Sequence, residues 1–237
     1  MQRYFAQAKN SNSFVLNSDD LFHIKTVMRM VDGDLIEVVY QNDVYICSLN
    51  NVNDDIKIII VKKLENIAKK DVEIVLAIPL VKEQKMDFIL QKSTELGVKK
   101  IIPFIAERSI IKLTDDKEQN KIKRWQKICK EASEQSKRVD IPVVTNVKSL
   151  KDLIDFDGQK IVCSTKKDVN SVKLFLQKQI YCDKLLLVIG PEGGLSEKEE
   201  TYLVNHGFYQ VTLGNRIMRV ETVPLFLLSI INYEFME

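Results

Sequence analysis

The chain has 237 residues, of which 45% are hydrophobic and 29% are charged, and its formal net charge is +2. These values are typical of a folded protein with a real core, and the length fits one large domain or two smaller ones. The small net charge excludes recognition of nucleic acid by the overall charge of the chain. Any such role must therefore rest on local basic patches.

Four cysteines occur in the chain, and their spacing argues against a metal site. No pair has the CxxC spacing, and neither histidine lies at ligand spacing from a cysteine. The pattern favours free thiols in a reducing compartment, so we expect no metal cofactor and no structural zinc. The cysteines are Cys47, Cys129, Cys163 and Cys182.

The two ends of the chain argue against export and membrane insertion. The first residues lack the apolar core of a signal peptide. The most apolar stretch, residues 223–231, contains Pro224 and is far shorter than the roughly 18 residues that a spanning helix needs. We therefore expect a cytoplasmic protein whose C-terminal segment is a buried helix.

The first part of the chain, to about Lys70, is rich in short predicted strands. Residues 41–43 and 32–34 have the composition of turns, and residues 23–30 have apolar side chains at helical spacing. Several short strands with little helix are typical of a small barrel. The strands are expected at residues 35–40, 44–49 and 56–61.

The pattern changes between residues 66 and 72, where we place a domain boundary, and strands then alternate with helices. This alternation predicts an α/β domain with a largely parallel sheet. Gly97 ends one helix, and Ser196 with Glu199 forms a capping box that starts another. Strands are expected at residues 72–78, 101–105, 161–162, 185–189 and 209–213. Helices are expected at 85–96, 119–138, from 196 onward and at 221–235.

A glycine-rich loop follows the continuous apolar run 185–189. In open α/β sheets, ligands bind beyond the carboxyl ends of strands, and glycines let backbone N–H groups approach a ligand closely. The loop therefore predicts a ligand cradle, with a tight strand-to-helix turn as the alternative. It is neither a P-loop nor a GxGxxG dinucleotide motif. Its residues are Gly190, Pro191, Glu192, Gly193 and Gly194.

A second chemistry-bearing segment spans residues 213–222, again where a strand ends and a helix begins. Two arginines, Arg216 and Arg219, lie close to Glu221. At the mouth of a pocket these side chains could hold a substrate and handle a proton. The alternative is a solvated loop with an acidic residue at a helix N-terminus.

Motifs along nearly the whole chain resemble the RsmE family of SPOUT-type RNA methyltransferases. They include HIKTVMR at 23–29, GD at 33–34, KMD at 85–87, TELGV at 94–98, RS at 108–109, EASEQSKR at 131–138, IGPEGG at 189–194 and LGNRIMRVET at 213–222. Three positions depart from the usual Leu, Thr and Ala of the last motif: Met218, Val220 and Val223. Val220 lacks the hydroxyl, which puts any role of that side chain in doubt, whereas Leu to Met preserves volume.

The resemblance implies a PUA-like, RNA-binding β-barrel at residues 1–70 and a SPOUT methyltransferase domain with a trefoil knot at residues 71–237. It also implies a homodimer that uses S-adenosyl-L-methionine to methylate N3 of a uridine in the 16S rRNA of the small ribosomal subunit. Three loops would hold the cofactor, largely through their backbone. Their residues are Ser164, Thr165, Ile189, Gly190, Pro191, Glu192, Gly193, Gly194, Leu213, Gly214, Ile217, Met218 and Arg219.

Uridine N3 carries a proton, so methylation needs a base or a positive charge that stabilises the uridine anion. Position in the matched motifs makes Glu221 and Glu192 the candidate bases and Arg219 the candidate cation, with Arg108 or Arg138 as further possibilities. Glu192 could instead fix its loop, and Glu221 could be a helix cap. The residues expected to contact RNA are Arg3, Lys25, Arg29, Arg108 and Arg138.

Basic residues also crowd residues 121–138, but such a run is usually a solvated helix face, and Trp125 within it is expected in the core. His23 and His206 are interpreted as packing or capping residues. Three other functions stay open: a catalytically inactive RNA-binding protein, a SPOUT methyltransferase that acts on another RNA such as tRNA, and a nucleotide-binding oxidoreductase. The last lacks the GxGxxG loop with its following acidic residue.

Overall fold

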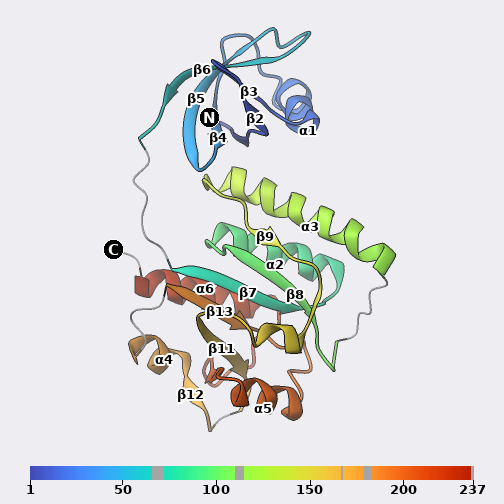
Figure 1. Ribbon diagram of the computed structural model, residues 1–237, viewed down its shortest axis with the longest axis vertical. Helices are drawn as coiled ribbons and strands as arrows, with labels where there is room; N and C mark the ends of the chain where they lie inside the picture. The colour runs from blue at the N-terminus through green and yellow to red at the C-terminus, as the bar shows by residue number, and fades with distance from the viewer. Residues whose placement is uncertain (66–71, 110–114, 167, 179–182, 236–237) are drawn as a thin grey trace. The chain divides into compact units, whose positions relative to one another are not determined.

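The computed structural model describes residues 1–65, 72–109, 115–166, 168–178 and 183–235 (Figure 1). The chain divides into two compact units, each described here by itself. One contains Met1–Lys69 and Ser133–Asp140, and the other contains Lys70–Ala132 and Ile141–Glu237. Most of the expected boundary at residues 66–72 lies outside the described residues.

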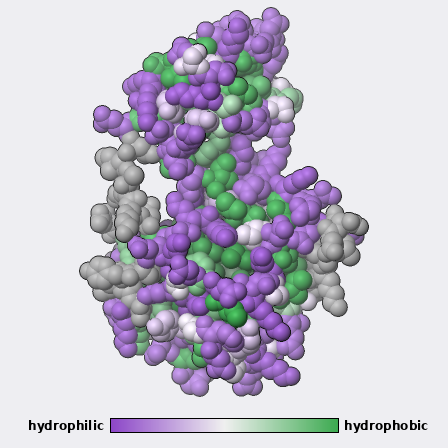
Figure 2. Space-filling view, in the orientation of Figure 1, coloured by the Kyte–Doolittle hydropathy of each residue, from purple (hydrophilic) through white to green (hydrophobic). Residues whose placement is uncertain are grey.

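The N-terminal unit contains a six-stranded sheet in the order β1-β4-β5-β6-β3-β2. Its pairings are antiparallel except that β1 runs parallel to β4. Alternate residues of these strands enclose a core around Ile36, Val38, Leu49 and Ile58. The strands are β1 (Arg3–Phe5), β2 (Ala8–Lys9), β3 (Ser13–Val15), β4 (Leu35–Tyr40), β5 (Asp43–Asn50) and β6 (Lys57–Lys63). The face of this unit in Figure 2 is mainly hydrophilic, with small hydrophobic areas between.

A short helical segment in this unit begins earlier than the sequence predicts. Helix α1 (Ser18–Phe22) starts where the side chain of Asn17 accepts a hydrogen bond from the backbone N–H of Asp20. It continues as a π-helix, His23–Val27. The predicted helix at residues 23–30 was therefore misplaced by several residues, because the Asn17 cap was overlooked.

The second unit is built on an eight-stranded sheet in which every recorded pairing is parallel. Its order is β10-β8-β7-β13-β11-β14-β12, and β9 pairs with β8. The strands are β7 (Glu73–Pro79), β8 (Lys100–Ile105), β9 (Val143–Val144), β10 (Lys148–Ser149), β11 (Gln159–Ser164), β12 (Asn170–Ser171), β13 (Lys184–Val188) and β14 (Tyr209–Thr212). The predicted parallel α/β domain is confirmed.

Helices cover both faces of this sheet. On β13, Leu185 and Leu187 belong to one core cluster, whereas Leu186 and Val188 belong to another. The first cluster includes residues of α2 (Glu83–Glu95), α3 (Asp115–Gln135), α4 (Val172–Lys178) and α6 (Thr222–Phe235). The second includes Leu203 of α5 (Glu197–Asn205) and Leu153 of the 3-10 helix Leu150–Leu153. A strand buried on both faces explains the continuous apolar run at 185–189.

Most predicted elements of this unit are confirmed to within a few residues. Helix α3 ends at Gln135 rather than at 138, because Lys137 adopts a positive φ of 60° that a helix cannot continue through. Trp125 is buried, as expected for a core residue. No helix in the described part of the chain is long and apolar enough to cross a membrane.

Candidate functional site

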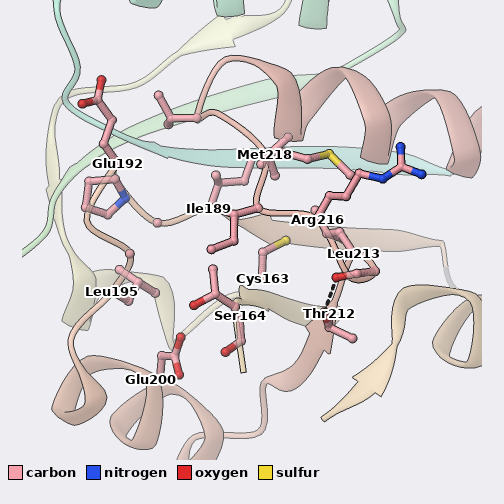
Figure 3. A pocket seen from close by; sticks show the side chains of 18 of the residues that line it. Cys163, Ser164, Ile189, Glu192, Leu195, Glu200, Thr212, Leu213, Arg216 and Met218 are labelled. Atoms are coloured by element: carbon pink, nitrogen blue, oxygen red, sulfur yellow. Dashed lines mark hydrogen bonds between the residues drawn. The ribbon is translucent and has the colours of Figure 1, made fainter. Parts of the chain in front are cut away.

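A cavity of about 400 Å³ lies where the loops after β11, β13 and β14 meet (Figure 3). These strands are neighbours in the order β13-β11-β14 and run parallel, so their carboxyl ends reach the same edge of the sheet. That arrangement turns three segments distant in sequence into the walls of one pocket. The volume is within the range of small-molecule sites.

Most residues that the sequence assigns to a cofactor line this cavity. They are Ser164, Thr165, Ile189, Gly190, Pro191, Glu192, Gly194, Leu213, Gly214, Ile217 and Met218. Gly193 and Arg219 do not line it, although both lie next to residues that do. Arg216 and Val220, within the segment 213–222 that the sequence singles out, also line the cavity. Lining residues that the sequence did not indicate include Cys163, Leu195, Glu200 and Thr212.

The glycine-rich loop is folded tightly enough to require glycine at Gly190. A Cβ atom there would lie 2.8 Å from the backbone nitrogen of Leu195 and 3.2 Å from the carbonyl carbon of Gly194. On the opposite wall, Gly214 has a φ of 110°, a conformation that side chains with a Cβ rarely adopt. Both loops therefore present bare backbone to the cavity.

Lys85, in the first turn of α2, joins the two acidic residues proposed as bases. Its Nζ lies 2.5 Å from Oε1 of Glu192 and 3.3 Å from Oε2 of Glu221. Glu192 belongs to the glycine-rich loop, and Glu221 follows the loop after β14. A single ammonium group thus connects the two sequence motifs on the cavity walls. The sequence analysis matched Lys85 to the family but gave it no role, because 107 residues separate it from Glu192.

The charges around Glu192 keep its carboxyl group ionised. The hydrogen bond from Lys85 lowers the pKa of Glu192 below its ordinary value, and the charges of Lys85, Lys82 and Arg219 lower it further. The same hydrogen bond raises the pKa of Lys85. A carboxylate with a lowered pKa is a weaker base, so Glu192 is better suited to binding a cation than to removing a proton.

Glu221 has a different environment. Its side chain is mostly buried, and its Oε2 atom has no hydrogen-bond partner among the described residues, although Lys85 lies nearby. Arg219, two positions earlier, is exposed, and its carbonyl accepts hydrogen bonds from the N–H groups of Thr222 and Val223 at the start of α6. Arg219 and Glu221 therefore stand at a helix N-terminus beside the cavity.

Arg108 supports the glycine-rich loop from outside. Its Nη1 donates a 2.7 Å hydrogen bond to the carbonyl of Gly193, and the neighbouring Glu107 N–H donates to Oε1 of Glu199. Glu199 also completes the capping box of α5 with Ser196. The hydrogen bond to Gly193 therefore engages, within the protein, a guanidinium that was expected from the sequence to contact RNA.

The other residues expected to contact RNA belong to the N-terminal unit. Arg3 is buried, and its guanidinium donates to Oε2 of Glu37 at 2.8 Å and to the carbonyls of Lys137 and Arg138. Arg138 is paired with Asp140 at 2.8 Å. These contacts occupy both guanidinium groups, so neither suits a phosphate contact. Lys25 and Arg29 are exposed, although Lys25 donates to the carbonyl of Asn53.

One buried acid beside the cavity had no role in the sequence analysis. Glu200, in the first turn of α5, has only 6% of its surface exposed and contributes to the cavity lining. Its Oε2 accepts a 2.8 Å hydrogen bond from Gln210 on β14 and lies 3.5 Å from Nζ of Lys166. In sequence, an acid at a helix N-terminus is explained well enough by the helix dipole, so nothing marked this one out.

The chain is similar in sequence to known RNA methyltransferases. The model of the RNA methyltransferase domain family matches residues 68–232. Ribosomal RNA small subunit methyltransferase E of Bacillus subtilis is 36% identical over 99% of this chain and 97% of its own length. The chain belongs to the RsmE family. Val220, where the sequence departs from the family pattern, places a buried apolar side chain in the cavity wall.

Two solved structures of similar fold have a bound cofactor. A ribosomal RNA small subunit methyltransferase E from Neisseria gonorrhoeae, bound to S-adenosyl methionine, is 27% identical with a TM-score of 0.86. A putative methyltransferase from Legionella pneumophila, in complex with the same cofactor, is 26% identical with a TM-score of 0.89. Each comparison covers 98% of this chain and 97% of the other.

Proposed function

We propose that this chain is an S-adenosyl-L-methionine-dependent methyltransferase that methylates N3 of a specific uridine in 16S rRNA of the small ribosomal subunit. The observation that carries this proposal is the cavity at the carboxyl ends of β11, β13 and β14. Its walls include the two segments that carry the family resemblance; Glu192 lines it, and Glu221 lies beside it. The names of the full-length relatives supply small-subunit ribosomal RNA as the substrate, and the family resemblance supplies uridine N3.

The cavity fits the cofactor in size and chemistry. Its wall combines apolar side chains, among them Ile189, Leu213 and Met218, with the bare backbone of Gly190 and Gly214. Such a lining suits a molecule with a flat apolar base and several polar edges. When bound, the cofactor supplies an electrophilic methyl group on a sulfonium sulfur.

The residues beside the cavity would act on the uridine. We propose that Glu221 accepts the N3 proton and that Arg219 stabilises the negative charge that spreads onto the uracil carbonyl oxygens. Lys85 is a positioning residue: it holds Glu192 and Glu221 in a fixed relation from the first turn of α2. Glu192 then contributes through its ion pair with Lys85 rather than as the base.

We further propose the finer features that the family resemblance implies. The six-stranded N-terminal sheet would be a PUA-like barrel, and the parallel sheet would contain the trefoil knot formed by the loops of the cofactor site. The active form would be a homodimer, which sedimentation equilibrium at several protein concentrations would test. Because the proposed substrate is ribosomal, the enzyme would work in the cytoplasm. The spacing of its cysteines and histidines leads us to expect that it uses no metal.

The RNA surface that we propose is narrower than the one expected from the sequence. Lys25 and Arg29 have exposed side chains in the N-terminal unit and keep their expected role in binding phosphates. Arg3 and Arg138 are left out because each is held by contacts within this unit. Arg108 is assigned to the support of the glycine-rich loop.

Two measurements test the function. Mass spectrometry of 16S rRNA from cells with and without the gene should show the loss of one N3-methylated uridine on deletion and its return on complementation. Retention of every methylated uridine would refute the substrate. Isothermal titration of the purified protein with S-adenosyl-L-methionine separates an enzyme from an inactive RNA-binding protein, since the latter would give no heat at millimolar cofactor.

A further inference from the structure

Glu200 is a buried acid in the wall of the cavity, and the proposed methyl transfer does not use it. Its residue surface is 6% exposed, and few carboxylates are buried so far without a specific set of partners. Figure 3 shows Glu200 well separated from Glu192, with Leu195 between them in the view. It is therefore remote from the cluster of Lys85, Glu192 and Glu221, where the reacting methyl group is expected.

The two recorded partners of this carboxylate contact the same oxygen. Gln210 donates to Oε2 at 2.8 Å, and Lys166 Nζ lies 3.5 Å from Oε2. Among the residues that the structure describes, none donates a hydrogen bond to Oε1. A carboxylate offers about four acceptor positions, so acceptor capacity remains on Oε1 of this cavity-lining residue.

The charge of Lys166 indicates which kind of ligand group would donate a hydrogen bond to Glu200. The ammonium of Lys166 already compensates part of the carboxylate charge, and it would repel a second cation placed at the same group. A neutral donor meets no such repulsion. In S-adenosyl-L-methionine, the neutral donors are the N6 amine of the adenine and the two ribose hydroxyls, all on the adenosyl half.

We propose that Glu200 is a cofactor-recognition residue that accepts a hydrogen bond from a neutral donor of the adenosyl group. Lys166 and Gln210 are positioning residues that hold the carboxylate in its orientation. The inference rests on the proposed function, because it takes the ligand of the cavity to be S-adenosyl-L-methionine. It extends that function by assigning the buried end of the site to a particular part of the ligand.

The test is isothermal titration of the intact protein and of Glu200→Gln with S-adenosyl-L-methionine and S-adenosyl-L-homocysteine. A charge-assisted hydrogen bond predicts a loss of affinity of roughly tenfold or more for Glu200→Gln. The loss should be equal for the two ligands, because both contain the same adenosyl donors. A loss confined to S-adenosyl-L-methionine would mean that the carboxylate acts on the sulfonium, and it would overturn the proposal.

Glu197 provides a matched control on the same turn of α5. It also lies near Lys166, at 3.9 Å, but its side chain is 85% exposed and does not line the cavity. Glu197→Gln should bind both ligands as tightly as the unmodified protein. Melting temperatures of both variants, measured without ligand, report any damage to α5 itself. Equal affinity losses in the two variants would assign the effect to the helix rather than to recognition.

Ligand analogues identify the donor and keep the proposal falsifiable. Two analogues of S-adenosyl-L-homocysteine are needed, one with hypoxanthine in place of adenine and one with a 2′,3′-dideoxyribose. The analogue that lacks the true donor should bind Glu200→Gln and the unmodified protein equally. If both analogues keep the full penalty, the proposal is wrong. If the unmodified protein binds no cofactor at all, the proposed function itself fails.

Discussion

At the scale of single residues, Lys85 gives the site its charge arrangement. Two carboxylates near one another repel, and a cation between them offsets that repulsion. The ammonium of Lys85 lies 2.5 Å from Glu192 and 3.3 Å from Glu221, on a side chain that is 29% exposed. The side chain of Glu192 is 51% exposed and that of Glu221 is 19% exposed, so water screens the contact with Glu221 less than the contact with Glu192.

Removing this cation should change the pH dependence of the reaction. In the intact protein the Lys85 hydrogen bond lowers the pKa of Glu192, so the ion pair persists as the pH falls through the ordinary carboxyl range. In Lys85→Met this ion pair is absent at every pH, so the part of the acid-side loss of kcat/KM that comes from protonation of Glu192 should disappear. At neutral pH, kcat/KM should fall on the order of a hundredfold, as expected when catalytic groups are misplaced.

Lys82 is the matched control for Lys85. It precedes the same helix, is exposed, and also lowers the pKa of Glu192, but through its charge alone. Lys82→Met should leave kcat/KM within about threefold of the unmodified value, because a charge exposed to water contributes little. An unchanged acid-side loss of kcat/KM in Lys85→Met would show that this loss does not come from breaking the ion pair of Lys85 and Glu192.

Substitutions of Arg219 and Glu221 should lower the rate of methyl transfer without weakening cofactor binding. Neither lines the cavity, so Arg219→Ala and Glu221→Gln should bind S-adenosyl-L-methionine nearly as well as the unmodified protein. Turnover on small ribosomal subunits should fall by about 10² to 10⁴-fold, the usual contribution of a proton acceptor or a charge stabiliser. Arg216→Ala, which alters a lining residue, should instead weaken cofactor binding. Full turnover in either of the first two variants would remove that residue from the mechanism.

At the scale of elements, the strands and helices with strong periodicity could be predicted from the sequence, and the short ones could not. Strand β13 is recognisable as a continuous apolar run, and α2 by its apolar spacing with Gly97 at its end. Strands β2, β9, β10 and β12 have two residues each, too few to show any alternation. They exist because a neighbouring strand offers hydrogen bonds, which is information that the local sequence does not contain.

The cofactor site, like the strands and helices, could be predicted only in part from the sequence. The loops at residues 190–194 and 213–218 were found because a glycine follows a strand in each, a pattern that suits a ligand cradle as well as a tight turn. Lys85 and Glu200 were missed because their meaning depends on partners that the fold brings together. In the sequence, Lys85 can be explained as a solvated surface lysine, and Glu200 can be explained as an acid that interacts favourably with the helix dipole.

The glycine-rich loop allows a prediction at this scale. Gly190→Ala would force a Cβ to within 2.8 Å of the Leu195 backbone, so the loop or the start of α5 must shift. We expect a loss of about 1–3 kcal/mol in the free energy of unfolding and a severe loss of cofactor affinity. Thermal unfolding and isothermal titration would measure the two effects.

Gly193, three positions later in the same loop, is the control. A Cβ there would meet only the Arg108 side chain, at 3.5 and 3.8 Å, which is ordinary van der Waals contact, and its φ is not positive. Gly193→Ala should stay within about 0.5 kcal/mol of the unmodified stability and retain cofactor binding. Equal behaviour of the two alanine variants would contradict the close packing inferred at Gly190.

At the scale of the whole molecule, the N-terminal unit is discontinuous in sequence. It contains Ser133–Asp140, the end of α3 and the turn after it, together with residues 1–69. The sequence could not reveal this, since the contact that joins them links Arg3 to carbonyls 134 and 135 residues away. A single boundary near residue 70 therefore describes the chain incompletely, and the segment 133–140 has to be considered with the first domain.

Arg3 should accordingly be a stability residue rather than an RNA ligand. In Arg3→Met, the carbonyls of Lys137 and Arg138 lose their donor and Glu37 loses one of its two cations, so we expect a loss of about 2–4 kcal/mol on urea denaturation. Lys63→Met, which breaks the exposed pair with Asp43, should cost much less stability than Arg3→Met, because water screens an exposed pair. RNA affinity per folded molecule should be unchanged in both variants.

The pH dependence of this effect distinguishes an ion pair from simple packing. Burial raises the pKa of Glu37, but the hydrogen bonds and charges of Lys137 and Arg3 outweigh it and leave the pKa below its ordinary value. The stability from this group is therefore fully present above its ordinary pKa and is lost as the pH falls through the lowered value. The difference in stability between the unmodified protein and Arg3→Met should shrink over that acid range. A difference that stays constant with pH would assign the role of Arg3 to its backbone hydrogen bonds alone.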